Sequence, residues 1–108
     1  APSQAPQLKR ALAQDLLFSN QLEEAEKIYT ELAAEEPRDV QSHLRLSQIY
    51  RQQRQWEKAR AAADKARELD PNNLEVRYNE VNLYEAEGKF TQGINLMKDM
   101  LTQTAKRS

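Results

Sequence analysis

Apolar side chains recur every three or four residues in six segments of the chain, and short polar stretches separate these segments. This spacing is typical of amphipathic helices, because residues three and four apart share one helix face. The connecting stretches are only a few residues long, so each helix must run antiparallel to the one before it. The expected helices span about residues 6–18, 22–35, 40–53, 56–69, 74–87 and 90–104.

The composition fits a single all-helical domain. Of the 108 residues, 39% are hydrophobic and 31% are charged, and only two are Gly and four are Pro. A chain of this length buries roughly two-thirds of its unfolded surface, and its frequent Ala, Leu, Glu, Lys, Gln and Arg favour helix. The start of the chain, residues 1–5, resembles a linker, so we expect the sequence to be a fragment of a longer protein.

The pattern repeats at an interval of 34 residues. A large apolar residue begins every second helix, a very small residue follows three positions later, and a Pro closes the first two units. Corresponding positions are Leu22, Trp56 and Phe90; Ala25, Ala59 and Gly93; Pro37 and Pro71; Leu16, Tyr50 and Tyr84; Ala13, Ser47 and Val81; and Asn20, Arg54 and Gly88. A period of this length indicates a solenoid of stacked helical units.

In these positions and in its period, the chain resembles the tetratricopeptide repeat family, whose unit is a pair of antiparallel helices. The resemblance covers about residues 6–107 and is strongest in the middle unit, with "LRLSQIY", "WEKARAAADKA" and "DPNN". It implies an all-α, right-handed superhelix of six antiparallel helices, with the first helix of each unit on the concave side. The expected units are residues 6–39, 40–73 and 74–107.

Alanines dominate the second helix of the middle unit for a steric reason. Three of them recur on one face, where larger side chains would hold the crossing helices apart. These three are Ala59, Ala63 and Ala66. Pro71 prevents the helix from continuing and disfavours helical backbone at Asp70. Either Asn72 or Asn73 is expected to cap the following helix.

Two residues depart from the pattern of their repeat positions. Glu80 lies where the other units have leucines, and a buried lone carboxylate is costly, so we expect it to be partly exposed or paired. Its candidate partners are Arg77, Arg45 and Arg51. Arg54 lies in an inter-helix turn where the other units have Asn and Gly, which predicts a turn that does not strictly require a positive φ.

Polar residues of the first helices line up opposite the packing face and form a candidate peptide groove. In several members of the family this concave face is the ligand groove, and amide and guanidinium groups can hydrogen-bond the backbone of an extended peptide. The candidates are Gln7, Arg10, Gln14, Phe18, Gln41, Arg45, Gln48, Gln52, Tyr78, Asn79 and Asn82. An ordinary hydrated surface, with the binding face elsewhere, fits the same residues equally well.

Charge is unevenly distributed, although the formal net charge is only −1. Seven acids and two bases lie in residues 21–39, seven bases and two acids in 40–67, and seven acids and three bases in 68–99. Ion pairing between units is the favoured explanation, and a basic strip that attracts an acidic peptide is the alternative. A subclass of the family grips chaperone carboxyl termini with basic residues, which Glu75 and Asn79 replace here, so chaperone binding is not expected.

The last helix is expected to expose an apolar side, because each solenoid unit buries one face against the next. The residues concerned are Ile94, Met97, Met100 and Leu101. Either further protein or a second copy covers them, and we expect a homo-oligomer with the last helix pair in the contact. In the alternative, Lys98 and the methionines make the face tolerable in a monomer.

Nothing in the sequence indicates catalysis, a metal site or a cofactor. His43, the only histidine, lies on a packing face, and there is no Cys and no Gly-rich phosphate loop. Nucleic-acid binding by the basic middle unit is a weaker alternative, because acidic units flank it. No apolar run is long enough for a membrane span.

We therefore expect a soluble, non-catalytic protein–protein interaction scaffold with a protein or peptide partner, no nucleic acid and no membrane insertion. The main alternative is an architectural module that assembles with itself and binds no peptide. The absence of Cys does not identify a compartment, so the protein could be cytoplasmic or exported.

Overall fold

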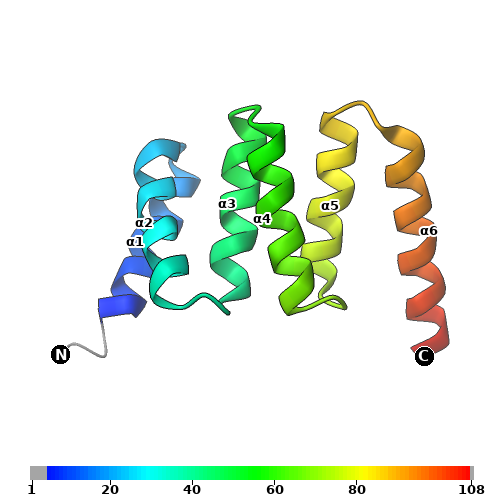
Figure 1. Ribbon diagram of the computed structural model, residues 1–108, viewed down its shortest axis with the longest axis horizontal. Coiled ribbons are helices and arrows are strands. Elements are labelled where there is room, and N and C mark those ends of the chain that lie inside the picture. Colours follow the sequence, from blue (N-terminus) through cyan, green and yellow to red (C-terminus); the bar gives the residue numbers. More distant parts are fainter. Residues whose placement is uncertain (1–4, 108) are drawn as a thin grey trace.

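The computed structural model describes residues 5–107. Six α-helices and no strands lie within these residues. They are α1 (Ala5–Phe18), α2 (Leu22–Glu35), α3 (Val40–Gln52), α4 (Trp56–Leu69), α5 (Leu74–Ala86) and α6 (Phe90–Arg107). Their order along the molecule follows the sequence (Figure 1). The helix prediction is confirmed, although α6 extends to Arg107 and Ala5 is already helical. The rest of the expected linker, residues 1–4, lies outside the described part.

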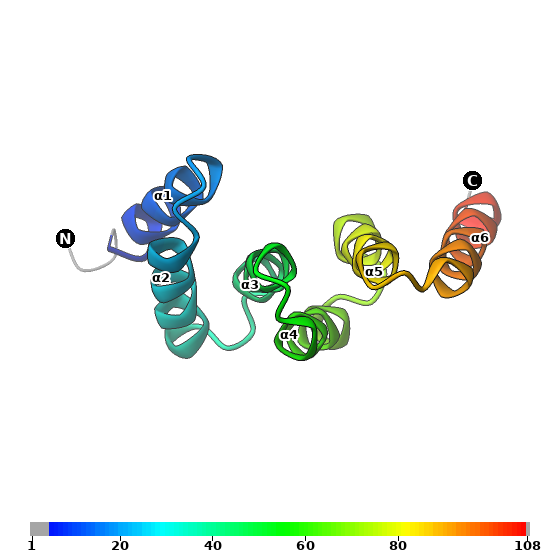
Figure 2. The same cartoon turned by 90° about the horizontal axis from the view of Figure 1, so that it is seen from above.

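The helices form an elongated, curved array rather than a closed bundle, with extents of 45 × 32 × 21 Å. Each helix packs on the next along the chain, and α3 also contacts α5. Seen from above, α1, α3 and α5 lie along one side, with α2 and α4 along the other (Figure 2). On the first side α3 is set back between α1 and α5, so this side is concave. The expected all-α solenoid is confirmed.

Buried alanines lie where α4 packs against its neighbouring helices. Ala59, Ala63 and Ala66 are buried in α4, whereas Ala61 of the same helix is exposed. The Ser47 Oγ of α3 donates to the Ala59 carbonyl of α4 at 2.8 Å, which requires the two backbones to approach closely. A larger side chain at these positions would separate the helices. The steric explanation for the alanine-rich segment therefore fits the packing.

The three turns within the hairpins have the same backbone geometry, and the expectation for Arg54 is wrong. Asn20, Arg54 and Gly88 have φ values of 64°, 61° and 78°. In each turn the next residue donates its backbone N–H to a carbonyl five residues earlier, as Gln55 does to Tyr50 at 2.8 Å. This bond is typical of a left-handed helix end. The hairpin geometry therefore requires a positive φ even where the residue carries a Cβ.

The connection between α4 and α5, residues 70–73, has the helix stop and the helix cap that the sequence predicted. Helix α4 stops at Leu69, just before Asp70 and Pro71. Of the two asparagines proposed as caps, it is Asn73 whose side-chain oxygen accepts from the backbone N–H groups of Glu75 at 2.9 Å and Val76 at 3.2 Å. Two of the free donors at the start of α5 are thereby satisfied.

Candidate functional site

Helices α1, α3 and α5, which form the concave side (Figure 2), carry the predicted groove residues, most of which are exposed or half-buried. Those that are exposed are Gln7, Gln14, Phe18, Gln52, Tyr78 and Asn82. Those that are half-buried are Arg10, Gln41, Arg45 and Gln48. The first helices therefore present a row of polar side chains with an aromatic residue on α1 and another on α5.

Asn79 is the exception, and its assignment to the groove surface needs correction. Its side chain is only 2% exposed, and its Nδ2 donates to the Ser47 Oγ at 2.8 Å. The repeat-equivalent residue, Arg45, is half-buried because its long side chain extends from the same position to the surface. The short Asn side chain cannot do so. Asn79 therefore joins α5 to α3 and is not available to a ligand.

The two arginines of the predicted groove, Arg10 and Arg45, are engaged in ion pairs. Arg45 Nη2 lies 3.2 Å from Glu75 Oε2, and its Nη1 donates to Gln48 Oε1 at 3.0 Å. Arg10 Nη1 donates to Asp39 Oδ2 at 2.6 Å. Burial alone would raise the Asp39 pKa, but hydrogen bonds from Ser42 and Arg10 outweigh burial and hold this pKa below its ordinary value. Neither arginine of the predicted groove therefore supplies an uncompensated positive charge.

Ion pairs also explain much of the uneven charge distribution. Three arginines of α3 and α4 pair with glutamates of the hairpin formed by α5 and α6 and its turn. These pairs are Arg45 with Glu75, Arg60 with Glu87, and Arg67 with Glu80. Each pair contributes little alone because its arginine is partly solvated. Together they fix how the α5–α6 hairpin stacks on the α3–α4 hairpin, as the favoured interpretation expected.

Glu80 is paired, as expected, but with a partner that the sequence did not suggest. Its side chain is buried, and Oε2 accepts from Arg67 Nη1 at 3.1 Å. The suggested partner Arg77 instead donates to the Pro71 carbonyl, at 3.3 Å. Glu80 Oε1 has no hydrogen-bond partner. Burial therefore raises the pKa of Glu80, with the positive charges of Arg67 and Arg77 opposing the shift.

Glu80→Gln is expected to raise the free energy of unfolding at pH 7 by about 1 kcal/mol, the scale of an unsatisfied buried polar group. Because the folded-state pKa is raised, the native protein loses stability as pH rises from the ordinary value of 4.5 through the folded-state pKa. The variant lacks this loss. Urea denaturation should therefore show a difference at neutral pH that disappears below about pH 4.5. Exposed Glu24→Gln is the control, and an equal gain there would contradict the explanation.

His43 takes part in a local hydrogen bond that supports the fold. Its side chain is half-buried, and its Nε2 donates to the Pro37 carbonyl at 2.9 Å. This bond connects α3 to the loop that precedes it. Among residues 5–107, no three His, Cys, Asp or Glu side chains cluster in a way that could hold a metal ion. Within the same residues, no helix has the length and apolar character needed to cross a bilayer.

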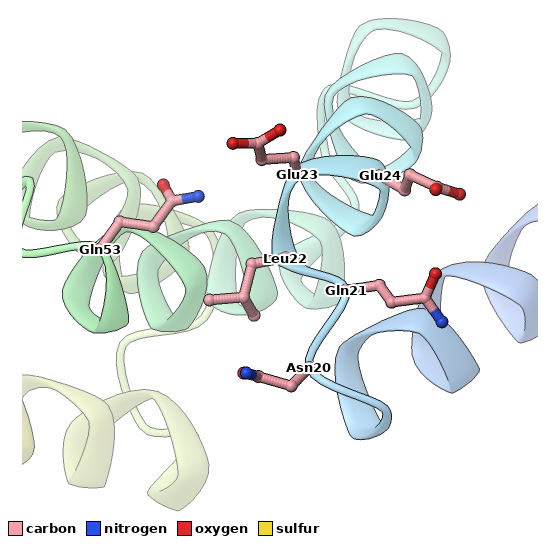
Figure 3. Close-up of a pocket in the computed structure, with 6 residues that line it drawn as sticks. All are labelled: Asn20, Gln21, Leu22, Glu23, Glu24 and Gln53. Carbon is pink, nitrogen blue, oxygen red and sulfur yellow. The ribbon is translucent and has the colours of Figure 1, made fainter.

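A hollow that the sequence did not predict lies at the turn end of the first hairpin (Figure 3). It measures about 470 Å³ and is lined by Asn20, Gln21, Leu22, Glu23, Glu24 and Gln53. Leu22 points towards the segment that carries Gln53, and Glu23 lies above it (Figure 3). Two acids, Glu23 and Glu24, line the hollow, and none of the predicted groove residues does. Sequence periodicity does not indicate this hollow, because it lies between the turns of two neighbouring hairpins.

The family model for the tetratricopeptide repeat matches residues 10–73. The chain belongs to the tetratricopeptide repeat family. Among curated proteins, it is 36% identical over 107 residues to Protein O-mannosyl-transferase TMTC1 of Mus musculus and of Homo sapiens. The match covers 99% of this chain but 10% of the mouse protein and 11% of the human protein. This tetratricopeptide repeat chain therefore spans about a tenth of the length of these relatives.

The C-terminal hairpin of this tetratricopeptide repeat chain exposes the apolar surface that the sequence predicted, with one correction. Ile94, Met97 and Leu101 are exposed by 48%, 41% and 72%. Met100, in contrast, is only 7% exposed. It points to the α5 side of the helix, where it helps to line a hollow of about 390 Å³. The other lining residues are Leu74, Tyr78, Met97, Leu101 and Thr104.

Proposed function

We propose that this chain is a non-catalytic protein-interaction module that binds an extended peptide segment of a partner protein on the concave side of α1, α3 and α5. We further propose that residues 6–39, 40–73 and 74–107 act as its three repeat units. Membership of the tetratricopeptide repeat family supports a protein-binding role. The transferase activity in the relatives' name belongs to proteins about ten times as long as the matched stretch.

The observation that carries this proposal is a row of carboxamides on the three concave helices. Gln14, Gln48 and Asn82 lie at successive 34-residue intervals, so each occupies the same position on α1, α3 and α5. Gln14 and Asn82 are exposed, and Gln48 is half-buried. A carboxamide both donates and accepts, as a peptide backbone does. The row therefore supports recognition of backbone groups along an extended ligand.

Charge favours a ligand that is recognised mainly through neutral groups. Arg45 is paired with Glu75, and Arg10 with Asp39, so neither supplies a free positive charge for an acidic peptide. Glu75 also accepts from Gln41 at 3.4 Å, which leaves a carboxylate near the first turn of α5. Binding should consequently depend only weakly on salt, in contrast to the steep dependence expected for nucleic acid.

A random peptide library displayed on phage, selected against the whole chain, tests this proposal. The triple variant Gln14→Ala, Gln48→Ala and Asn82→Ala should weaken binding of the selected peptides by a factor of roughly 30 to 160. This estimate assumes the loss of two or three hydrogen bonds of about 1 kcal/mol each. The matched control replaces three exposed amides elsewhere: Gln21→Ala, Gln92→Ala and Asn95→Ala. No enriched peptide, or equal losses in both variants, would argue against the concave site.

A further inference from the structure

Exposed large hydrophobic side chains are confined to the two ends of the array. All nine of those identified among the described residues belong to α1, α5 or α6, and the α3–α4 hairpin contributes none. Exposed apolar groups concentrated in this way mark interaction surfaces more often than scattered ones do.

The contact between α4 and α5 shows how one hairpin receives the next. Val76 of α5 is buried in a cluster with Val40, Leu44 and Ala66 of the α3–α4 hairpin. Adding 34 to the positions of these last three residues gives Leu74, Tyr78 and Met100. These are three of the residues that line the 390 Å³ hollow between α5 and α6. The hollow therefore corresponds to the seat that α5 occupies on the preceding hairpin.

Helix α1 carries the complementary positions. Val76 and Glu80, which bury against α3 and α4, correspond to Leu8 and Leu12 at an offset of 68 residues. These two leucines are 69% and 52% exposed. They form a ridge on the helix that corresponds to α5 but has no hairpin before it among the described residues.

At one pair of repeat positions, the two residues match in chemistry at both contacts within the chain and also at the two ends of the array. The ion pair of Arg67 with Glu80 joins α4 to α5. At the α2–α3 contact the same positions are Ala33 and Leu46, which belong to one apolar cluster. At the two ends of the array they are Leu101 and Leu12. A charge thus meets an opposite charge within the chain, and an apolar group would meet an apolar group between chains.

We propose that the ridge of one copy, Leu8 and Leu12, docks into the hollow of a second copy between α5 and α6. The second copy then continues the solenoid in the same direction. This contact is heterologous, because two different surfaces meet, so it leaves one ridge and one hollow free for further copies. It goes beyond peptide binding on the concave side, and it differs from a symmetric contact between two last helices.

One residue of α1 should limit the strength of this contact. Asp15 corresponds to Ile49 and Leu83, both of which are fully buried against the preceding hairpin. In the docked copy its carboxylate would approach the position of Met97, and burying a charge without a partner is unfavourable. Asp15→Leu should therefore tighten self-association at least tenfold. This substitution provides a gain of binding that damage to the fold cannot imitate.

Two complementary variants test the proposal by sedimentation velocity. The ridge variant carries Leu8→Lys and Leu12→Lys, and the hollow variant carries Met97→Lys and Leu101→Lys. All four positions are exposed, so the fold should tolerate them. Wild-type protein should grow beyond dimers with concentration, whereas each variant alone should stay monomeric. Their equimolar mixture should form a 1:1 dimer and no larger species, because the outer ridge and outer hollow are both blocked.

Several outcomes would overturn head-to-tail docking. If the ridge variant alone dimerises, the hollows pair with each other in a symmetric contact. If wild type stays monomeric up to its solubility limit, or the mixture forms no dimer, a different protein segment must cover these surfaces. Circular dichroism should confirm that each variant is helical. Should a double variant fail to fold, the milder Leu12→Ala and Leu101→Ala should each weaken wild-type association about tenfold.

Discussion

Ala59→Leu is expected to lower the free energy of unfolding by about 3 kcal/mol, at the upper end of the range for overpacking a core. Ala59 is fully buried and belongs to a cluster with Ala63 and Leu83. Its carbonyl accepts from the Ser47 Oγ at 2.8 Å, so α3 and α4 are already in close contact there. Three additional carbon atoms would have to separate the helices or distort this hydrogen bond. Urea denaturation followed by circular dichroism measures the loss.

Ala61→Leu is the matched control for this prediction. Ala61 lies two residues further along the same helix, but its side chain is exposed. Ala and Leu have similar helix propensities, so the control should change stability by no more than about 0.5 kcal/mol. A large loss in both variants would mean that the alanines are required for helix formation rather than for helix contact. A small loss in both would mean that the contact can widen freely.

The sequence predicted the helices well because their determinants are local and occur three times. The 34-residue interval aligned a small residue and a large apolar residue in each unit, and a helix-ending Pro in the first two units. Each alignment reinforced the others, and the predicted ends lie within a few residues of the observed ones. A cap at Asn72 or Asn73 and the helix stop before Pro71 were predictable for the same reason, since both depend on neighbouring residues alone.

The details that the sequence did not predict depend on how one helix lies against another. Arg67 and Glu80 meet only because α4 and α5 cross at one particular register. The sequence predicted which helix face carries Asn79 but not how deeply its side chain is buried, since that burial depends on how closely α3 approaches. Arg54 adopts a positive φ because the hydrogen bond that closes the hairpin requires it, although an arginine does not favour this backbone conformation.

Leu83→Ala is expected to lower the free energy of unfolding by about 3 kcal/mol, within the range for truncating a buried leucine. Leu83 is completely buried, with 0% of its surface exposed, and it packs with Ala59 and Ala63 of α4. Exposed Leu101→Ala is the control, and it should cost less than about 0.5 kcal/mol in dilute solution. Thermal denaturation of both variants at low concentration measures the difference.

The distribution of this loss along the chain is more informative than its size. In an array whose hairpins contact only their neighbours, stability is approximately a sum of unit and interface contributions. Leu83 lies in the interface between the α3–α4 hairpin and the α5–α6 hairpin, and α6 packs mainly on α5. The variant should therefore lose amide hydrogen-exchange protection first in α5 and α6, while α1 to α4 keep theirs. Equal loss in all six helices would instead mean that the array unfolds as one cooperative unit, with the interfaces stronger than the hairpins they join.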